Sequence, residues 1–257
     1  MTTRITTSRR ADGITLLKIS GPERRNILDE TSYAQLIDAL AAAEADDEVK
    51  VLIITGSENC FTAGNDLANY KALAQATEVP AITFLRRLHA FPKPVIAAAE
   101  GLALGLGSSI LMHCDFAYAG NSTTFYLPFV NFALTPLGAT TLMLPKLAGN
   151  KAASEMLMLG ASLSASRACE LGLLTDTTPD GMALEQAFDS ASRLLSKPFD
   201  ALLATKALLR EGDAEAIGHA FDREEQQLLE RCRSPEAQGA IDAFFAKQVS
   251  SGKGRSG

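Results

Sequence analysis

FTAGNDL at residues 61–67 and GLALGLGSS at residues 101–109 are two glycine-bearing turns, and each follows an apolar run typical of a β-strand. Glycine permits positive φ angles and lets a ligand come close to the backbone. A helix that begins just after the second turn would add the positive end of its dipole. Together the turns can aim backbone N–H groups at one carbonyl oxygen, which is the arrangement of an oxyanion hole.

Length and composition indicate an ordinary globular protein. The 257 residues are 47% hydrophobic and 21% charged, which suits one large core, either alone or with a small appendage. The net charge of −6 argues against nucleic acid as a partner, because binding it needs a basic face.

The cysteines and the N-terminus predict a cytoplasmic protein that does not contact membranes. The first residues contain no apolar signal region. The longest apolar run, residues 95–112, is interrupted by Glu100 and by glycines, so it predicts a buried strand, turn and helix. Four scattered cysteines, expected to be reduced core residues, stand at Cys60, Cys114, Cys169 and Cys232.

Strands alternate with helices in the first half of the chain, which predicts an α/β fold with a mostly parallel sheet. Strands are expected at 13–19, 51–56 and 94–99, with a helix through residues 33–40 that Thr31 caps. After Pro136 the strand pattern almost disappears and helices follow one another, at 140–147, 151–159, 165–171, 182–195, 200–209, 214–229 and 235–247.

We place a boundary near Lys197-Pro198. Residues 1–197 form the expected α/β core with the site, and residues 198–257 form a helical C-terminal region that ends in a flexible tail from Ser250.

Several common sites are not supported by the residues. The glycines at 105 and 107 lack the third glycine of a dinucleotide fingerprint, because Ile110 stands there. Three separated histidines give neither a catalytic triad nor a metal site. His113 is expected to be a hydrogen-bonded core residue, and Asp115 a turn or cap residue.

Four further segments, together with the two turns, resemble the sequence of a known family. They are PVIAAAEG at 94–101, Cys114-Asp115, PFVNF at 128–132 and LPKLAG at 144–149. In this order and spacing the chain resembles the crotonase, or enoyl-CoA hydratase/isomerase, superfamily, and the segment at 128–132 resembles its Δ3,Δ2-enoyl-CoA isomerase-like branch.

The resemblance implies a spiral of β-β-α turns in two stacked sheets, with C-terminal helices that assemble a homotrimer or hexamer. It implies an acyl-CoA thioester substrate in fatty acid metabolism, with no cofactor beyond the CoA of the substrate and no metal. The amides of Asn65 and Leu106 would hold the thioester oxygen and stabilise an enolate, and their side chains would be incidental.

The same resemblance places CoA along residues 22–28, where Arg24 would meet phosphates as a bidentate donor. The alternative for its two arginines is a solvated loop. The implied CoA-binding residues are Arg24, Arg25, Ala63, Asp66 and Leu67.

The chain departs from the family at the catalytic carboxylates. Hydratase glutamates are replaced by Ser109 and Phe129, and the isomerase glutamate is replaced by Leu137. None of these three side chains transfers a proton near pH 7. An apolar pocket is indicated by Phe129, Phe132, Leu137 and Met143.

The nearest polar candidates for a base are Asp66, Glu100 and Tyr126, although Asp66 is expected to stabilise its own turn. The sequence therefore predicts an acyl-CoA-processing enzyme of isomerase or hydratase type with an atypical site. The alternatives are a non-catalytic acyl-CoA-binding homologue and an acyl-CoA thioester hydrolase.

Overall fold

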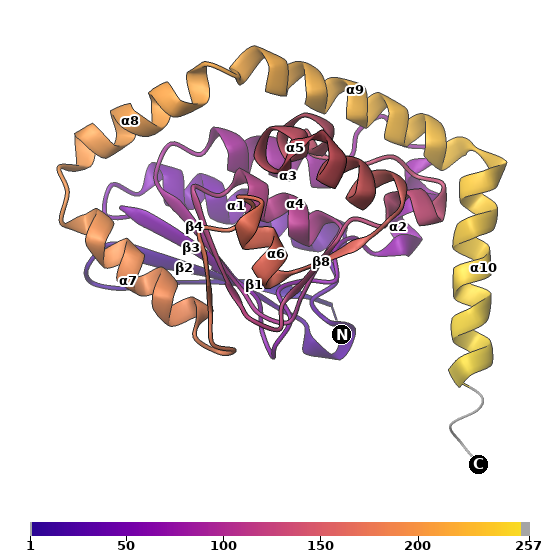
Figure 1. The fold of residues 1–257 in the computed structure, drawn as a ribbon, viewed down its shortest axis with the longest axis horizontal. Helices are drawn as coiled ribbons and strands as arrows, with labels where there is room; N and C mark the ends of the chain where they lie inside the picture. The colour runs from indigo at the N-terminus through magenta and orange to yellow at the C-terminus, as the bar shows by residue number, and fades with distance from the viewer. Residues whose placement is uncertain (1, 253–257) are drawn as a thin grey trace.

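The computed structural model describes residues 2–252 and has two sheets, as expected for the α/β fold (Figure 1). The larger sheet has the order β1-β2-β3-β4-β6-β9, in which only the β1–β2 pair is antiparallel. Its strands are β1 (Arg4–Arg9), β2 (Ile14–Ser20), β3 (Val51–Thr55), β4 (Val95–Ala99), β6 (Phe116–Gly120) and β9 (Asp176–Thr178). The smaller sheet, in the order β5-β7-β8, consists of β5 (Leu102–Leu104), β7 (Thr124–Tyr126) and β8 (Ser162–Ser164).

The helices follow the predicted series closely. Short 3-10 helices η1 (Pro22–Arg24) and η2 (Phe129–Phe132) flank the candidate site. The α-helices are α1 (Glu30–Ala45), α2 (Leu67–Leu73), α3 (Pro80–Ala90), α4 (Leu106–His113), α5 (Thr140–Met158), α6 (Ala165–Glu170), α7 (Ala183–Leu195), α8 (Phe199–Glu211), α9 (Ala214–Arg233) and α10 (Pro235–Gly252). None of the helices in the described part of the chain is long and apolar enough to cross a membrane.

Three local predictions were wrong. Asp29, not Thr31, caps α1, because its carboxylate accepts the Ser32 N–H at 2.9 Å. Strands do continue after Pro136, since β8 and β9 extend the two sheets, but three residues each are too few to leave a pattern. The tail begins later than Ser250, because α10 runs to Gly252; residues 253–257 lie outside the described part.

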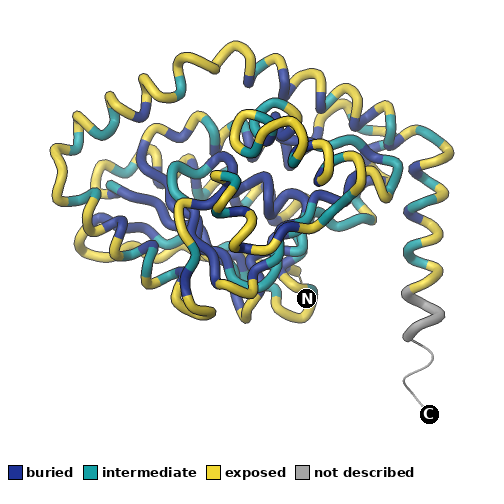
Figure 2. The backbone as a smooth tube through the Cα atoms, viewed as in Figure 1, coloured by how far each residue is buried: buried dark blue, intermediate teal, exposed yellow. Residues whose placement is uncertain are grey.

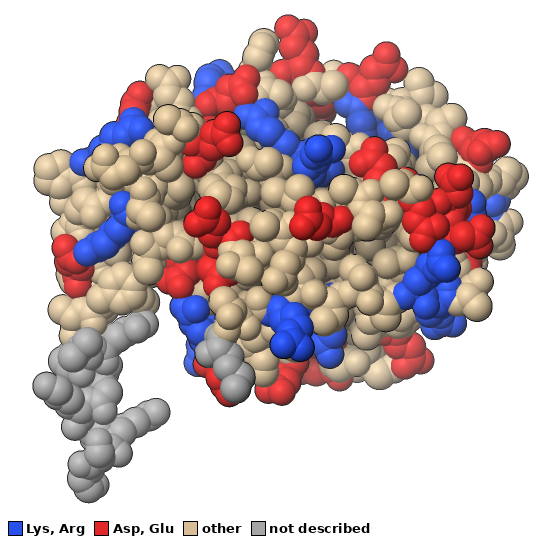
Figure 3. Space-filling view, turned by 180° about the vertical axis from the view of Figure 1, so that it is seen from behind, with Lys and Arg blue, Asp and Glu red and all other residues tan. Residues whose placement is uncertain are grey.

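The central strands of the larger sheet are buried on both faces, as Figure 2 shows for the centre of the molecule, whereas the edge strand β1 is mostly exposed. Every residue of β3 and β4 is buried, which explains their continuous apolar sequences. One face packs on the main core with α1, α3 and α4, and the other packs on the alanines of α7. On the side of the molecule seen in Figure 3, acidic and basic side chains are interspersed and form no continuous basic patch.

Helices α8 and α9 arch over this core, and α10 descends beside it (Figure 1). Asp115 anchors the arch, so it is more than the expected turn or cap residue. Its carboxylate accepts hydrogen bonds from the Lys206 ammonium at 2.6 Å, the Arg210 guanidinium at 2.9 Å and the Val95 N–H at 2.8 Å. These contacts fix α8 to the carboxyl end of α4.

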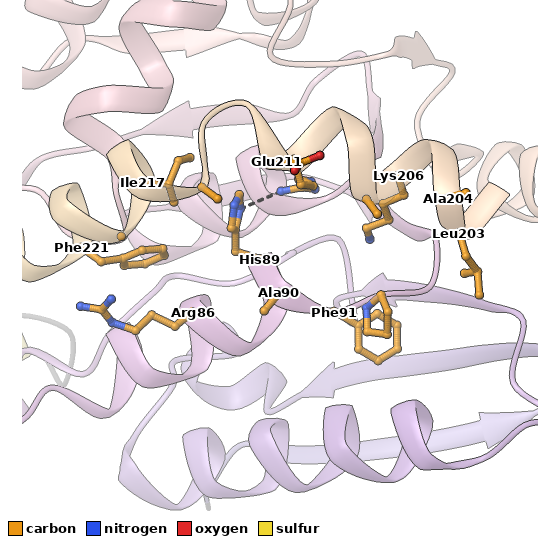
Figure 4. Close-up of a pocket in the computed structure, with 15 residues that line it drawn as sticks. Arg86, His89, Ala90, Phe91, Leu203, Ala204, Lys206, Glu211, Ile217 and Phe221 are labelled. Atoms are coloured by element: carbon orange, nitrogen blue, oxygen red, sulfur yellow. Dashed lines mark hydrogen bonds between the residues drawn. The ribbon is translucent and has the colours of Figure 1, made fainter. Parts of the chain in front are cut away.

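His113 is a fully buried core residue, as predicted. Its Nε2 lies 2.8 Å from the Gly138 carbonyl and its ring stacks on Phe221. His89 lies beside it and accepts from Arg210 at 2.7 Å, in a cavity of about 730 Å³ under α8 and α9 (Figure 4). Burial, followed by the charges nearby, lowers the pKa of His113 to about 3 and that of His89 to about 4.

These depressed pKa values predict a loss of stability in mild acid. The unfolded chain takes up protons at His89 and His113 near pH 6.5, while the folded chain does not protonate these two residues until about pH 4 or below. The free energy of unfolding should therefore fall as the pH drops below about 6.5. His113→Gln should make the free energy of unfolding depend less steeply on pH, reducing its slope against pH by up to about 1.4 kcal/mol per pH unit.

Urea unfolding at pH 7, 6 and 5 measures this slope. His219→Gln is the matched control, because His219 is exposed on α9. An H113Q protein with the slope of the unsubstituted protein would contradict the assignment to His113.

Candidate active site

The two glycine turns lie side by side. Thr62 forms a parallel bridge with Ala103, in which the Thr62 N–H donates to the Leu102 carbonyl at 3.1 Å and the Leu104 N–H donates to the Thr62 carbonyl at 3.0 Å. The turn after β3 therefore continues along β5, and β5 leads directly into α4.

Gly64 allows this close approach. A β-carbon at Gly64 would lie 2.5 Å from the Leu104 carbonyl oxygen and 3.4 Å from the Leu106 nitrogen, and φ is +77°. Any larger side chain would push the two turns apart. The missing side chain at Gly64 therefore brings two backbone segments together.

The N–H groups of Asn65 and Leu106 are available to a ligand. Leu28 forms a parallel bridge with Asn65, in which the Leu28 N–H donates to the Gly64 carbonyl and the Leu28 carbonyl accepts from the Asp66 N–H. In such a bridge the Asn65 N–H itself points away from Leu28. Leu106 is the first residue of α4, and its N–H has no acceptor within the helix. Neither N–H donates to an acceptor elsewhere in residues 2–252.

A cavity of about 830 Å³ opens at these two amides. Its wall comes from both turns, η1, η2, the end of β7 and α10. It brings together ten of the residues singled out from the sequence: Arg24, Arg25, Ala63, Asn65, Asp66, Leu67, Leu106, Tyr126, Phe129 and Phe132. The wall is otherwise largely apolar, with Leu134, Phe244 and Phe245.

Two of the three carboxylate positions do not reach this wall. Ser109 and Leu137 are both fully buried, and only Phe129 lines the cavity. Ser109 Oγ lies 3.1 Å from Thr140 Oγ1, and that hydroxyl donates to the Leu137 carbonyl at 2.7 Å. Met143, expected in the apolar pocket, lines a different cavity beneath α8.

The structure also separates the three polar candidates for a base. Asp66 caps α2 by accepting from the Ala68 N–H and pairs with Arg24 at 2.6 Å, so it holds its turn. Glu100 does not line the cavity; it accepts from the Ala183 N–H at the start of α7. Tyr126 does line it, and its hydroxyl accepts from Asn131 Nδ2 at 2.8 Å.

Sequence reasoning missed Asn26, which shapes the loop at residues 21–28, where CoA is expected and which we call the CoA loop. Its fully buried side chain accepts from the Gly21 N–H at 2.8 Å and donates to the Cys60 carbonyl at 2.7 Å. The loop is thereby fixed against the turn that precedes Phe61. No short-range pattern marks this role, because the carbonyls to which the Asn26 amide donates lie more than thirty residues away.

The Asn65 side chain makes two hydrogen bonds to tyrosine hydroxyls. Its Oδ1 accepts from the Tyr33 hydroxyl, and its Nδ2 donates to the Tyr70 hydroxyl at 2.6 Å. The two tyrosines are buried on α1 and α2. They hold the residue that offers one of the two amides.

Comparison with known proteins identifies the family of this chain. Residues 9–251 match the family model described as enoyl-CoA hydratase/isomerase. The 2,3-dehydroadipyl-CoA hydratase of Escherichia coli (strain K12) is 33% identical over 248 residues, which cover 96% of this chain and 97% of that protein. The enoyl-CoA delta isomerase 2 of Homo sapiens is 30% identical, with 92% of this chain and 62% of that protein covered.

Among solved structures, Pseudomonas aeruginosa OdaA superposes with a TM-score of 0.90 at 36% identity, covering 93% of this chain and 98% of that one. The chain therefore belongs to the enoyl-CoA hydratase/isomerase family, which confirms the predicted crotonase fold. It is a member of an enzyme family, and both of these relatives are named for CoA-linked substrates. In residues 2–252, no group of three His, Cys, Asp or Glu side chains can hold a metal.

Leu106→Pro tests the second amide directly. Proline is tolerated at the first position of a helix and lacks the N–H. Loss of one oxyanion donor typically lowers the rate by about 10²–10³-fold. We expect turnover, or binding of an enolate analogue, to fall by that factor while the circular dichroism spectrum stays unchanged. A folded L106P protein with full activity and affinity would exclude the Leu106 amide.

Proposed function

We propose that this protein processes acyl-CoA thioesters by an isomerase- or hydratase-type reaction, with the thioester oxygen held between the Asn65 and Leu106 amides. The observation that carries the proposal is the pair of unpartnered N–H groups at one largely apolar cavity. Removal of a proton beside the thioester carbonyl moves negative charge onto that oxygen, where the two donors and the start of α4 stabilise it.

The wall of the cavity suits both parts of such a substrate. Arg24 and Arg25 line it and would supply positive charge for the CoA phosphates. The acyl group would lie among aromatic side chains of η2 and α10, where Phe132 and Phe244 pack edge to face with ring centroids 5.5 Å apart. Helix α10 would thus contribute to binding the acyl group.

Tyr126 is the proton-transfer group that this cavity favours. The carboxylates on its wall are Glu23 and Asp66, and Asp66 is engaged by Arg24 and by α2. The Tyr126 carbonyl accepts from the Gly105 N–H at 2.6 Å, so its side chain starts beside the second turn. The Asn131 amide donates to the hydroxyl oxygen. In the proposed reaction that oxygen accepts the proton leaving the α-carbon as the O–H proton passes to the γ-carbon, so that the tyrosine ends each turnover unchanged.

One assay separates this function from its alternatives. We expect the protein to convert 3-enoyl-CoA to 2-enoyl-CoA. Crotonyl-CoA should be hydrated far more slowly than about 10 s⁻¹, because Ser109 and Phe129 replace the two carboxylates that would position water. Release of free CoA would indicate a thioester hydrolase, and binding without any product would indicate a non-catalytic homologue.

In the same assay, Tyr126→Phe removes the hydroxyl and keeps the ring. Loss of a positioned acid or base typically costs about 10²–10⁴-fold in rate, so isomerisation should fall within that range while the acyl-CoA dissociation constant stays nearly unchanged. An active Y126F protein would exclude Tyr126 as the proton-transfer group and leave the oxyanion hole untested by that variant.

We also propose that the chain forms the homotrimer or hexamer that the family resemblance implies. Two large apolar side chains of α8, Leu208 and Leu209, are 71% and 78% exposed, and Leu159 after α5 is 76% exposed. Such side chains are typical of a surface covered by another subunit. Sedimentation equilibrium should give three or six chains per particle, and a monomer at micromolar concentration would contradict this.

A further inference from the structure

The Asn65 amide group sits between two buried tyrosines, an arrangement we call the tyrosine clamp: Tyr33, Asn65 and Tyr70. Tyr33 is 3% exposed and Tyr70 is 4% exposed. The Tyr33 hydroxyl donates to Asn65 Oδ1, and Asn65 Nδ2 donates to the Tyr70 hydroxyl at 2.6 Å. Both polar atoms of the amide are thereby satisfied from opposite helices.

The backbone on each side of Asn65 is also held. The Leu28 N–H donates to the Gly64 carbonyl at 2.8 Å, and the Asp66 N–H donates to the Leu28 carbonyl at 2.9 Å. The Gly64 carbonyl and the Asn65 N–H belong to one peptide plane, so the Leu28 bond restrains that plane at its carbonyl end. The other end of the plane is the Asn65 Cα, which carries the clamped side chain. Holding the side chain therefore restrains the plane at its second end, and with it the direction of the N–H.

The space behind the clamp makes this restraint necessary. A second cavity of about 170 Å³ lies on the far side, and Asn65 and Tyr70 line both cavities. Without its two hydrogen bonds, the Asn65 side chain has room to turn into that space. Burial raises the pKa of both tyrosines above the usual value, so their hydroxyls stay neutral hydrogen-bonding groups. Tyr33 is itself packed against Phe84, with ring centroids 6.3 Å apart.

We propose that Tyr33 and Tyr70 are positioning residues that hold the Asn65 N–H at the angle needed to bind a thioester oxygen. This inference rests on the proposed function, because it assumes that a carbonyl oxygen occupies the space between the Asn65 and Leu106 amides. Helices α1 and α2 would thus contribute to the chemistry by orienting a backbone N–H, and not by direct contact with the acyl group.

The test compares two ligands that differ only at the carbonyl. Butyryl-CoA carries the thioester oxygen, and S-butyl-CoA is the thioether that lacks it. The ratio of their affinities, measured by calorimetry, reports the oxyanion hole apart from the rest of the site. We expect Tyr33→Phe and Tyr70→Phe each to lower this ratio by about 3- to 10-fold, toward the loss seen on removing a whole donor. Turnover should fall through kcat more than through KM.

Tyr118→Phe is the matched control. Tyr118 is 5% exposed and its hydroxyl bonds to Ser190 at 2.7 Å, but it lies on the α7 face of the large sheet. It should lose comparable stability and keep the affinity ratio. If the tyrosine variants do not fold, Asn65→Ala serves instead, since it removes the clamped amide and retains the backbone N–H.

The outcomes distinguish the two proposals. If the unsubstituted protein binds both ligands equally, the oxyanion hole itself is absent and both proposals fail. If it prefers the thioester and the tyrosine variants keep the full preference, only the clamp is overturned. If Y118F lowers the ratio as much as Y33F does, the effect is general softening of the core, and the clamp is likewise overturned.

Discussion

The close contact between Gly64 and the end of β5 is the constraint on which the site depends. The first turn can meet the second only because residue 64 has no β-carbon, with the Leu104 carbonyl oxygen 2.5 Å from where one would stand. The bridge from Thr62 to Ala103 then sets the register, and α4 begins at once with Leu106. Two N–H groups more than forty residues apart in the chain are thus fixed at one cavity without any side chain between them.

Contacts from the rest of the fold keep that site rigid. Leu28 and Asn26 tie the CoA loop to the first turn, and Tyr33 and Tyr70 hold Asn65 from two helices. The C-terminal helices act from the other side, because Asp115 fixes α8 to the end of α4 and α10 brings Phe244 to the wall of the cavity. Hydrogen-bond donors that are fixed before the substrate arrives need no reorganisation as charge develops, which is the physical basis of catalysis by an oxyanion hole.

The sequence predicted the parts of this site that local chemistry marks. Glycines at Gly64 and Gly105 identify the turns because few other residues allow such backbone angles, and the apolar runs identify β3 and β4. Sequence did not reveal that the Asn65 side chain is clamped, since its partners come from α1 and α2. It also left Glu100 as a base candidate, although that carboxylate caps α7. Such long-range hydrogen bonds leave no pattern at short spacing.

The surroundings of Leu137 show why a carboxylate cannot simply be restored at this position. Leu137 is fully buried. The Thr140 hydroxyl donates to the Leu137 carbonyl, and His113 bonds to the carbonyl of the next residue, Gly138. A carboxylate in that position would leave water without a partner of opposite charge, and it would stay protonated or disturb the core. The position resembling the seat of the isomerase base has become part of the packing. Under the proposed function, proton transfer comes from the wall of the cavity itself, where Tyr126 stands beside the turn that carries Leu106.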